Sequence, residues 1–388
     1  MTTTEHDNAL FFHTYKRLPL EVDRGEGCYL FTKDGKKYLD MFSGLAVNAL
    51  GYAHPAVTAA IDTQARKYTH LSNLFLQEPQ MALAEKLVKH SGYEKVFFCN
   101  SGTEANEGAI KLVRKWSKGE NRHGIFGMTN GFSGRTMGAL SLMDKKSYRE
   151  GYEPFLDEFG MIEFNDCADL EKKVGKETAA VFFESIQGEG GIVPVTQEFA
   201  ATLASLRKKF GFLLVADEIQ SGIGRTGKMF AFEHFGLRPD LVTFAKPVGG
   251  GLPLGGFLGT AALADVWAPG MHGTTFGGNP VACAAGNALV EIVLAPAFME
   301  TLRGNAVYFF TQLNALMQKY PVIRQVRGYG YMIGIDLAIE SAPVVENILR
   351  KGVLVNATAT TVVRVLPPLI AGRNEIDIFL SAFEESIQ

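Results

Sequence analysis

Residues 240–259 read DLVTFAKPVGGGLPLGGFLG, a stretch in which Lys246 ends an apolar run typical of a buried strand. A proline follows the lysine, and five glycines fall within residues 249–256. A P-loop places its lysine after the glycines, as in GxxxxGK[ST], so this order does not match one. Taken alone, Lys246 is either a desolvated amine that can form a Schiff base with an aldehyde or a surface lysine next to a glycine turn.

The run before Lys246 is one of several short apolar runs that alternate with helical patterns. Strand patterns occur at residues 95–100, 179–185, 212–219 and 240–246, and helical patterns at 57–68, 80–89, 103–117 and 198–210. This alternation predicts an α/β fold with a mostly parallel sheet covered on both faces. In open sheets of this kind, ligands bind beyond the carboxyl ends of the strands.

The two ends of the chain differ from its middle. A Lys-Asp-Gly-Lys turn within residues 20–42 predicts a small hairpin. After Pro280 the pattern is rich in helix, and its most apolar window, 281–299, predicts one buried helix rather than a membrane span. Short β-type runs at 352–357 and 360–369 then predict a second, smaller α+β domain.

Composition and charge narrow the class of protein. The 388 residues hold 38 Lys and Arg against 41 Asp and Glu, and no basic block is interleaved with aromatics, which argues against nucleic acid or an anionic membrane as a partner. Four cysteines lie far apart without a CxxC pair, and eight histidines lack ligand spacing, so we predict reduced thiols and no metal site. With no secretory signal pattern at the start, the sequence predicts a cytoplasmic protein.

The strand pattern at 95–100 runs directly into Ser101, Gly102 and Thr103, which open a helical pattern. Ser101 and Glu104 have the spacing of a capping box, and Gly102 allows a ligand to come close to the backbone. The free N–H groups and the positive dipole end of such a helix can hold a phosphate. The same residues also suit an ordinary capped helix.

Asp217 follows five apolar or small residues in FLLVADEIQSG (212–222), so we expect it to be buried. A buried carboxylate needs a cationic or hydrogen-bonding partner. A protonated pyridine nitrogen would be such a partner, and a structural salt bridge would be another.

The glycines of GIGRTG (222–227) match the G-x-G-x-x-G dinucleotide fingerprint, but their context does not. A true fingerprint opens a helix, whereas KMFAFEHFG follows here without a clear amphipathic stripe. The preceding strand also ends in Asp-Glu-Ile-Gln, which would set two carboxylates near the pyrophosphate. The sequence therefore argues against a nicotinamide-dependent oxidoreductase, and the absence of a GxSxG elbow argues against a hydrolase.

Three of these features belong to one kind of site. Lys246 offers a Schiff-base amine, Asp217 a carboxylate for a pyridinium, and residues 101–103 a phosphate cradle, which together are what pyridoxal phosphate requires. Phe132 is an aromatic residue available to stack on its ring, and HGTTFGGNP (272–280) supplies further hydroxyl groups.

The chain resembles the class III aminotransferases of fold type I from about Leu18 to its end. The motifs that carry the resemblance are GLAVNALGYAHP (44–55), HLSNLFLQEP (70–79), FFCNSGTEANEGAIKLVRK (97–115), QGEGG (187–191), ADEIQSGIGRTG (216–227) and HGTTFGGNP. The resemblance implies a large pyridoxal phosphate-binding domain at residues 56–285. It also implies a smaller α+β domain built from residues 1–55 and 286–388, and a C2 homodimer whose active sites are shared across the interface.

By this resemblance, the cofactor ring would be held by four side chains. Lys246 would carry it covalently and act as the catalytic base, and Asp217 would keep the pyridine nitrogen protonated. Gln220 would contact the ring hydroxyl, and Phe132 would stack on the ring face.

The phosphate would be bound at the helix start by Ser101, Gly102 and Thr103. The family pattern also implies that Thr275 reaches this phosphate from the other subunit, with Thr274 beside the substrate.

The implied reaction moves the δ-amine of acetylornithine to 2-oxoglutarate, giving glutamate. Arg135 would bind the carboxylate far from the reacting carbon, in a bidentate manner. Arg364 would bind the carboxylate next to the ketone of 2-oxoglutarate. Glu189 would pair with Arg364 when the first substrate is bound, and swing aside for the keto acid.

The sequence departs from the family pattern at two positions. Ser133 replaces the usual histidine of Phe-His-Gly-Arg, and Ser185 replaces the usual proline before QGEGG. Succinylornithine, ornithine, 4-aminobutyrate and a lysine-derived ω-amine stay open as donors. An aminomutase, a cofactor-binding protein without turnover and a nicotinamide-dependent oxidoreductase stay open as other functions.

Overall fold

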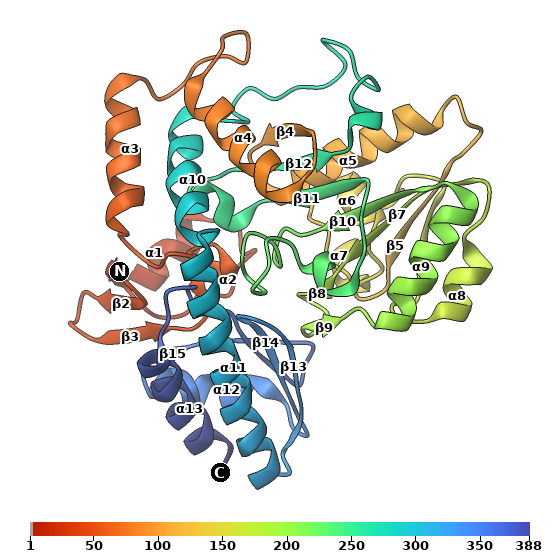
Figure 1. Ribbon diagram of the computed structural model, residues 1–388. Helices are drawn as coiled ribbons and strands as arrows, with labels where there is room; N and C mark the ends of the chain where they lie inside the picture. The colour runs from red at the N-terminus through yellow and green to blue at the C-terminus, as the bar shows by residue number, and fades with distance from the viewer. Residues whose placement is uncertain (1–2) are drawn as a thin grey trace.

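A computed structural model describes residues 3–388 of the chain. Figure 1 shows a large sheet with helices on both faces, and a smaller helix-and-strand layer that holds the C-terminus. Residues 1 and 2 of the predicted N-terminal segment lie outside the described part.

The large sheet has seven strands in the order β4-β12-β11-β10-β7-β5-β6. Their bounds are β4 (Lys95–Cys99), β5 (Gly124–Met128), β6 (Phe159–Ile162), β7 (Thr178–Glu184), β10 (Leu213–Asp217), β11 (Leu241–Phe244) and β12 (Gly255–Gly259). Strand β12 pairs antiparallel with β4 and β11, whereas the pairs from β11 to β6 are parallel. The predicted mostly parallel α/β sheet is therefore confirmed.

Alternating residues of the sheet face two sets of helices. Leu213 and Val215 of β10 pack on one side with α5 (Gly102–Ser117), and Leu214 packs on the other side with α9 (Gln197–Phe210). Both faces are thus apolar and covered, and the polar residues lie where the strands end. The helices around this sheet are α3 (Pro55–Lys67), α4 (Glu78–Ser91), α6 (Met137–Ser141), α7 (Lys146–Arg149), α8 (Cys167–Lys173) and α10 (Pro280–Val293).

A second sheet joins the two ends of the chain. Strands β1 (Val22–Glu26), β2 (Tyr29–Thr32) and β3 (Lys37–Asp40) form antiparallel pairs, which confirms the predicted hairpin. Strand β15 (Val353–Leu354) then adds to β3 in parallel. Residues more than 300 positions apart along the chain therefore lie side by side here. The short helices α1 (Thr3–Leu10) and α2 (Ser43–Ala46) lie in the same N-terminal part.

The third sheet is antiparallel, in the order β13-β14-β17-β16. Its strands are β13 (Ile323–Tyr329), β14 (Met332–Leu337), β16 (Asn356–Thr358) and β17 (Val362–Val365), and it packs with α11 (Pro296–Lys319), α12 (Ser341–Arg350) and α13 (Arg373–Ile387). A two-stranded ribbon, β8 (Ile186–Gln187) with β9 (Val193–Pro194), lies between this sheet and the large one. The predicted boundaries after residues 55 and 285 stay predictions.

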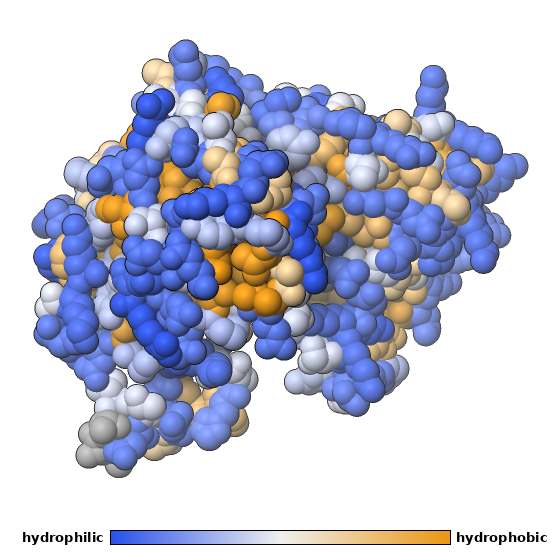
Figure 2. Space-filling model, turned by 90° about the horizontal axis from the view of Figure 1, so that it is seen from below, coloured by the Kyte–Doolittle hydropathy of each residue, from blue (hydrophilic) through white to orange (hydrophobic). Residues whose placement is uncertain are grey.

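The apolar window 281–299 was wrongly predicted as one helix. Helix α10 ends at Val293 and α11 begins at Pro296, because proline lacks the N–H that would continue α10. Within residues 3–388 no single helix is long and apolar enough to cross a membrane, and α10 and α11 meet those limits only as a pair bent by 67°. The face in Figure 2 is mostly hydrophilic, and its most prominent apolar patch lies near the middle, in keeping with a core that holds most apolar side chains.

Candidate active site

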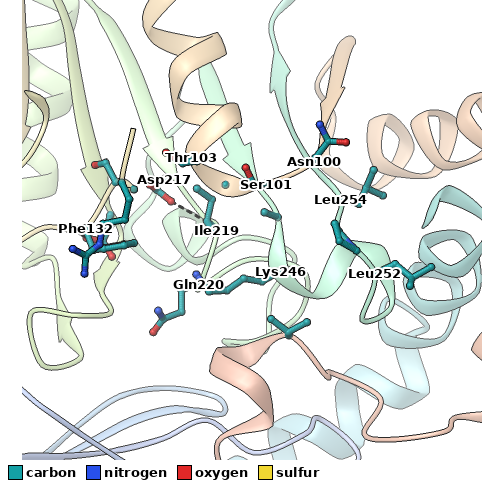
Figure 3. Close-up of a pocket in the computed structure, with 18 of the residues that line it drawn as sticks. Asn100, Ser101, Thr103, Phe132, Asp217, Ile219, Gln220, Lys246, Leu252 and Leu254 are labelled. Carbon is teal, nitrogen blue, oxygen red and sulfur yellow. Dashed lines mark hydrogen bonds between the residues drawn. The ribbon is translucent and has the colours of Figure 1, made fainter. Parts of the chain in front are cut away.

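A cavity of about 450 Å³ opens at the carboxyl ends of β4, β10 and β11. This is the edge at which an open parallel sheet binds ligands. The structure brings eight of the predicted residues into its lining, namely Ser101, Gly102, Thr103, Phe132, Arg135, Asp217, Gln220 and Lys246. Figure 3 shows Lys246 extending toward Gln220, with Leu252 and Leu254 on the opposite side.

Lys246 lies two residues beyond β11 and begins the 3-10 helix η2 (Lys246–Gly249). Its backbone adopts the left-handed region, with a φ of +47°, a conformation that non-glycine residues adopt at a cost. Burial lowers the pKa of its amine, although the carboxylates of Asp217, Glu189 and Glu184 oppose that shift. The neutral form of the amine is therefore more populated here than it is for a lysine on the surface.

Asp217 ends β10 and is almost fully buried. Its carboxylate accepts hydrogen bonds from the side-chain amide of Asn106 at 2.8 Å and from the backbone N–H of Ile219 at 3.1 Å. Burial raises its pKa, against these two hydrogen bonds and the charge of Lys246. No salt bridge among residues 3–388 includes Asp217, so the carboxylate can still accept a cationic partner.

Two residues that the sequence reasoning missed adjoin Asp217. Glu184 ends β7 directly opposite Asp217, and its carboxylate accepts the backbone N–H groups of Phe132 and Gly188, both at 2.9 Å. Burial and the neighbouring Asp217 raise the pKa of Glu184. The available signal was the same as for Asp217, a carboxylate that ends an apolar strand. Asn106 carried a weaker signal, as a polar residue among the buried positions of α5.

The predicted cap of α5 is half right. The hydroxyl of Ser101 accepts the backbone N–H of Glu104 at 3.4 Å, as expected. The carboxylate of Glu104 instead accepts the backbone and side-chain N–H groups of Asn100, at 2.6 and 2.9 Å. Asn100 offers two donors where the capping box offers one, which explains the difference. The first N–H groups of α5 have no partner within the helix, and Gly102 and Thr103, which carry two of them, line the cavity.

The first two turns of α5 hold the loop that carries Phe132 and Arg135. The hydroxyls of Thr103 and Thr136 lie 2.8 Å apart, and Glu107 accepts the backbone N–H of Gly138 at 2.9 Å. Between them, Asn106 donates to the backbone carbonyl of Ser133 at 2.8 Å. Positions 103, 106 and 107 share one helix face, so α5 attaches to the loop at three points.

Arg135 points its guanidinium at an aromatic ring rather than at a carboxylate. It lies 3.7 Å from the ring centroid of Tyr148, and Phe132 meets the same ring edge-on with centroids 6.0 Å apart. Arg135 forms no salt bridge within residues 3–388 and lines the cavity. It is therefore available to an anionic ligand.

Arg364 lies beside the cavity and is paired with Glu189. Its Nη1 donates to Glu189 Oε1 at 2.5 Å and to Gln220 Oε1 at 3.3 Å. Arg364 is 2% exposed, whereas the Glu189 side chain is 25% exposed. Burial would raise the pKa of Glu189, but the charge and hydrogen bond of Arg364 lower it overall, so Glu189 stays ionised.

Thr274 and Thr275 do not reach this cavity. The hydroxyl of Thr274 instead accepts the side-chain amide of Asn100 at 3.1 Å, and Thr275 is exposed. The contribution predicted for them across a subunit interface stays a prediction.

The two departures from the family pattern have different surroundings. The backbone N–H of Ser133 donates to Met143 Sδ at 3.0 Å. Ser185 donates its hydroxyl to Oε1 of Glu218 at 2.5 Å. Glu218 is fully buried and also accepts from the hydroxyl of Ser221 and from two backbone N–H groups of η1 (Ala231–Phe235). Burial raises the pKa of Glu218 to about 7, against these hydrogen bonds.

GIGRTG lies in turns rather than at a helix start, which removes the context of a dinucleotide fingerprint. Its Arg225 is buried and donates to the backbone carbonyls of Tyr331 and Pro367.

Comparisons with known proteins identify a family and related structures for this chain. The family model "Aminotransferase class-III" matches residues 11–387. Acetylornithine aminotransferase of Methanocaldococcus jannaschii is 43% identical over 96% of this chain and 94% of its own length. The crystal structure of ornithine aminotransferase from Toxoplasma gondii superposes with a TM-score of 0.94 at 29% identity, over 99% of this chain and 94% of that one. A PLP-bound amine transaminase from an uncultivated Pseudomonas species has a TM-score of 0.91 at 27% identity, over 97% and 98%.

Proposed function

Because the chain belongs to the class-III aminotransferases, we propose that it transfers the δ-amino group of N2-acetylornithine to 2-oxoglutarate. The products are N-acetylglutamate 5-semialdehyde and glutamate, in a step of arginine biosynthesis. One observation carries this proposal, namely a pair of arginines with opposite surroundings. Arg135 lines the cavity without an ion pair, whereas Arg364 is buried and paired with Glu189.

Pyridoxal phosphate is the cofactor of this enzyme family, and the cavity suits it. Its volume of about 450 Å³ lies within the usual range of small-molecule sites. Asp217 is a buried carboxylate without a salt bridge in the described chain, and the α5 N-terminus offers N–H groups for a phosphate. When bound, the cofactor supplies the electron sink for charge at the carbon that exchanges the amine.

These positions support the following cofactor roles. In this proposal Lys246 holds the cofactor covalently and Asp217 binds its ring nitrogen. Gln220 contacts the ring hydroxyl, and Phe132 covers one ring face. Ser101, Gly102 and Thr103 bind the phosphate, because they line the cavity at the helix start.

Lys246 would also move the proton, once the substrate amine has displaced its Nζ from the cofactor. Burial lowers the pKa of its amine, so a larger neutral fraction can accept a proton from the substrate carbon. The nearby carboxylates of Asp217, Glu189 and Glu184 then stabilise the ammonium that forms. The same Nζ would then return the proton and complete the transfer.

The two arginines serve the two ends of the substrates. Acetylornithine reacts at its δ-amine, so its carboxylate lies far from the reacting carbon and binds to Arg135. 2-Oxoglutarate has a second carboxylate next to its ketone, which needs a cation of its own. Arg364 supplies that cation once Glu189 moves aside, and the exposed side of Glu189 supports such a movement.

The enzyme acts as a homodimer in this proposal, with Thr275 of one subunit on the phosphate of the other and Thr274 beside the substrate. Highly exposed apolar side chains support an interface near this loop. Leu74 and Leu76 are 91% and 90% exposed, and Phe276 is also exposed and contacts the ring of His70. We place the enzyme in the cytoplasm, with small-molecule substrates and neither nucleic acid nor membrane as partners.

A panel of donors tests the function. Purified enzyme with 2-oxoglutarate is assayed with acetylornithine, succinylornithine, ornithine and 4-aminobutyrate, and kcat/KM is compared. We expect acetylornithine to be the best donor. A higher kcat/KM for ornithine or 4-aminobutyrate would reassign the donor within the family. A coloured protein that acetylornithine does not bleach would contradict the proposed substrate.

A further inference from the structure

Strand β16 contacts both members of the Glu189–Arg364 ion pair. Asn356 lies directly opposite Arg364 in the β16–β17 register. Asn356 and Thr358 are two positions apart on one strand, so their side chains leave the same face of the sheet. One contacts the arginine and the other contacts the backbone of the glutamate.

Asn356 fixes the guanidinium of Arg364 through one atom. Its Oδ1 accepts hydrogen bonds from Nε at 3.1 Å and from Nη2 at 2.6 Å. A guanidinium only donates, so the amide must present its oxygen to this edge. The acceptor is neutral, and it orients the arginine without cancelling its charge. The Nη1 end remains for the carboxylate of Glu189.

Thr358 holds Glu189 at its backbone rather than at its carboxylate. The Thr358 hydroxyl donates to the Glu189 carbonyl at 2.9 Å. The carboxylate therefore has freedom to rotate away while the chain beneath it stays in place. The contrast between 2% exposure of Arg364 and 25% exposure of the Glu189 side chain agrees with a fixed cation and a movable anion.

We propose that Asn356 and Thr358 are positioning residues for carboxylate exchange at Arg364. Asn356 fixes the orientation of the Arg364 guanidinium without neutralising its charge. Either Glu189 or the carboxylate of a keto acid can then neutralise that charge. An anionic residue at position 356 would neutralise Arg364 permanently and compete with the substrate. This inference rests on the proposed function, because it requires a second substrate carboxylate.

Substitution by an isosteric acid separates charge from geometry. Asn356→Asp retains both hydrogen-bond acceptor contacts and adds a charge, whereas Asn356→Ala removes the contacts without adding one. We measure the Kd of glutarate, a five-carbon dicarboxylate that lacks the ketone, by calorimetry on the aminated holoenzyme. We expect Asn356→Asp to weaken binding by roughly 10- to 100-fold, the usual range for charge-assisted hydrogen bonds, and Asn356→Ala to weaken it less.

The two half-reactions provide the second measurement. Cofactor absorbance follows the conversion of the loaded enzyme by acetylornithine and of the aminated enzyme by 2-oxoglutarate. Asn356→Asp should slow the second conversion strongly and change the first by less than about threefold. Asn347→Asp is the matched control, because Asn347 also accepts from an arginine, Arg350 at 3.1 Å, but on the surface. It should change neither reaction.

The outcomes distinguish the possible failures. Glutarate binding to Asn356→Asp that equals wild type, or an equal loss in both half-reactions, overturns the positioning role. If Asn356 had a purely structural role, Asn356→Ala would weaken glutarate binding more than Asn356→Asp does. A wild-type enzyme that binds glutarate but ignores acetylornithine would refute the proposed donor and leave the role of Asn356 testable.

Discussion

Lys246 combines a left-handed backbone with an amine whose pKa burial lowers. Both conditions are costly, and residues under such strain cluster at functional sites. The sequence placed this lysine at a strand end but could not reveal its φ of +47°, since lysine rarely adopts it. The conformation arises from the turn that η2 forms between β11 and the glycines.

Removal of the Lys246 amine is the most direct residue-scale prediction. Lys246→Ala should abolish turnover and the visible absorbance band of the bound cofactor, because both depend on that nitrogen. Lys228→Ala is the control, since the Lys228 amine donates to the backbone carbonyl of Glu233 outside the cavity. Steady-state assays and an absorbance spectrum check the result. A fully active Lys246→Ala enzyme would refute the assignment.

Tyr148 should govern how well Arg135 binds a carboxylate. Tyr148→Ala removes the ring that lies 3.7 Å from the guanidinium, so KM for both acetylornithine and 2-oxoglutarate should rise by roughly 3- to 30-fold. Tyr148→Phe keeps the ring and should stay close to wild type. Initial rates over a range of each substrate measure the effect. Unchanged KM values in Tyr148→Ala would mean that Arg135 is held by other contacts.

Which residues could be predicted depended on where their partners come from. Asp217 and Lys246 end apolar strands, and that pattern is visible in one segment. Asn356 acts only because β16 lies against β17 at the correct register, and this pairing is a property of the folded sheet. Asn106 likewise bridges two segments, Asp217 and Ser133, that are distant in sequence.

At the scale of elements, the link from β7 to β8 contains a residue that departs from the family pattern. Ser185 donates to Glu218, whose pKa burial raises from the ordinary value of 4.5 to about 7. Because the folded-state pKa is the higher one, stability from Glu218 is present below pH 4.5 and is lost as pH rises through about 7. The ionised carboxylate then depends most on its hydrogen-bond donors.

Ser185→Ala should therefore destabilise the protein more at pH 8 than at pH 5.5. We expect a loss of about 1–3 kcal/mol at pH 8, where the hydrogen bond is to a charged group, and about 1 kcal/mol at pH 5.5. Urea unfolding at the two pH values measures the difference. Ser381→Ala is the control, since Ser381 donates to Glu385 on the surface. An equal loss at both pH values would mean that Glu218 does not change charge in this range.

The glycine turn after η2 is under a conformational requirement. Gly250 has a φ of +61°, and a Cβ there would lie 3.1 Å from the side chains of Ala285 and Val57. Gly250→Ala should lower the unfolding free energy by about 1–3 kcal/mol and reduce activity, because η2 carries Lys246. Gly119→Ala, where a Cβ meets nothing within 4 Å, should be silent. Thermal unfolding and an activity assay test both variants.

Element bounds were predictable where a pattern was long and regular. The helix predicted at 103–117 begins one residue earlier in the structure, because periodicity and a capping serine agreed. The prediction of one helix at 281–299 was wrong because the uniform apolarity of the window hides the break between α10 and α11, although Pro296 marked its position. The strand predicted at 240–246 ends at Phe244, since the turn of η2 starts before the glycines.

At the scale of the whole molecule, the exposed apolar segment near residue 74 should be an interface. Leu74→Glu places a charge on a side chain that is 91% exposed, so the proposed homodimer should dissociate and the enzyme should lose activity. Val307→Glu, at 68% exposure on α11, should leave both unchanged. Size-exclusion chromatography with light scattering measures the oligomer. A wild-type enzyme that is active as a monomer would contradict the shared site.

The class of the fold followed from the alternation of strands and helices, but its connections did not. Strand β12 inserts antiparallel between β4 and β11, and β15 joins β3 from the opposite end of the chain. Pairings of this kind are set by packing over hundreds of residues, and local sequence patterns carry no record of them.

The three attachments between α5 and the loop at 132–139 also bear on how this enzyme could be redesigned. Thr103, Asn106 and Glu107 anchor that loop through hydrogen bonds. The orientation of Phe132 and Arg135 therefore depends on a helix some thirty positions earlier in the sequence. A loop transplanted from a relative would lack these hydrogen bonds unless the three helix residues were transferred with it. The start of α5 and the loop therefore form one structural unit. To exchange donor preference between relatives, both segments should be exchanged together.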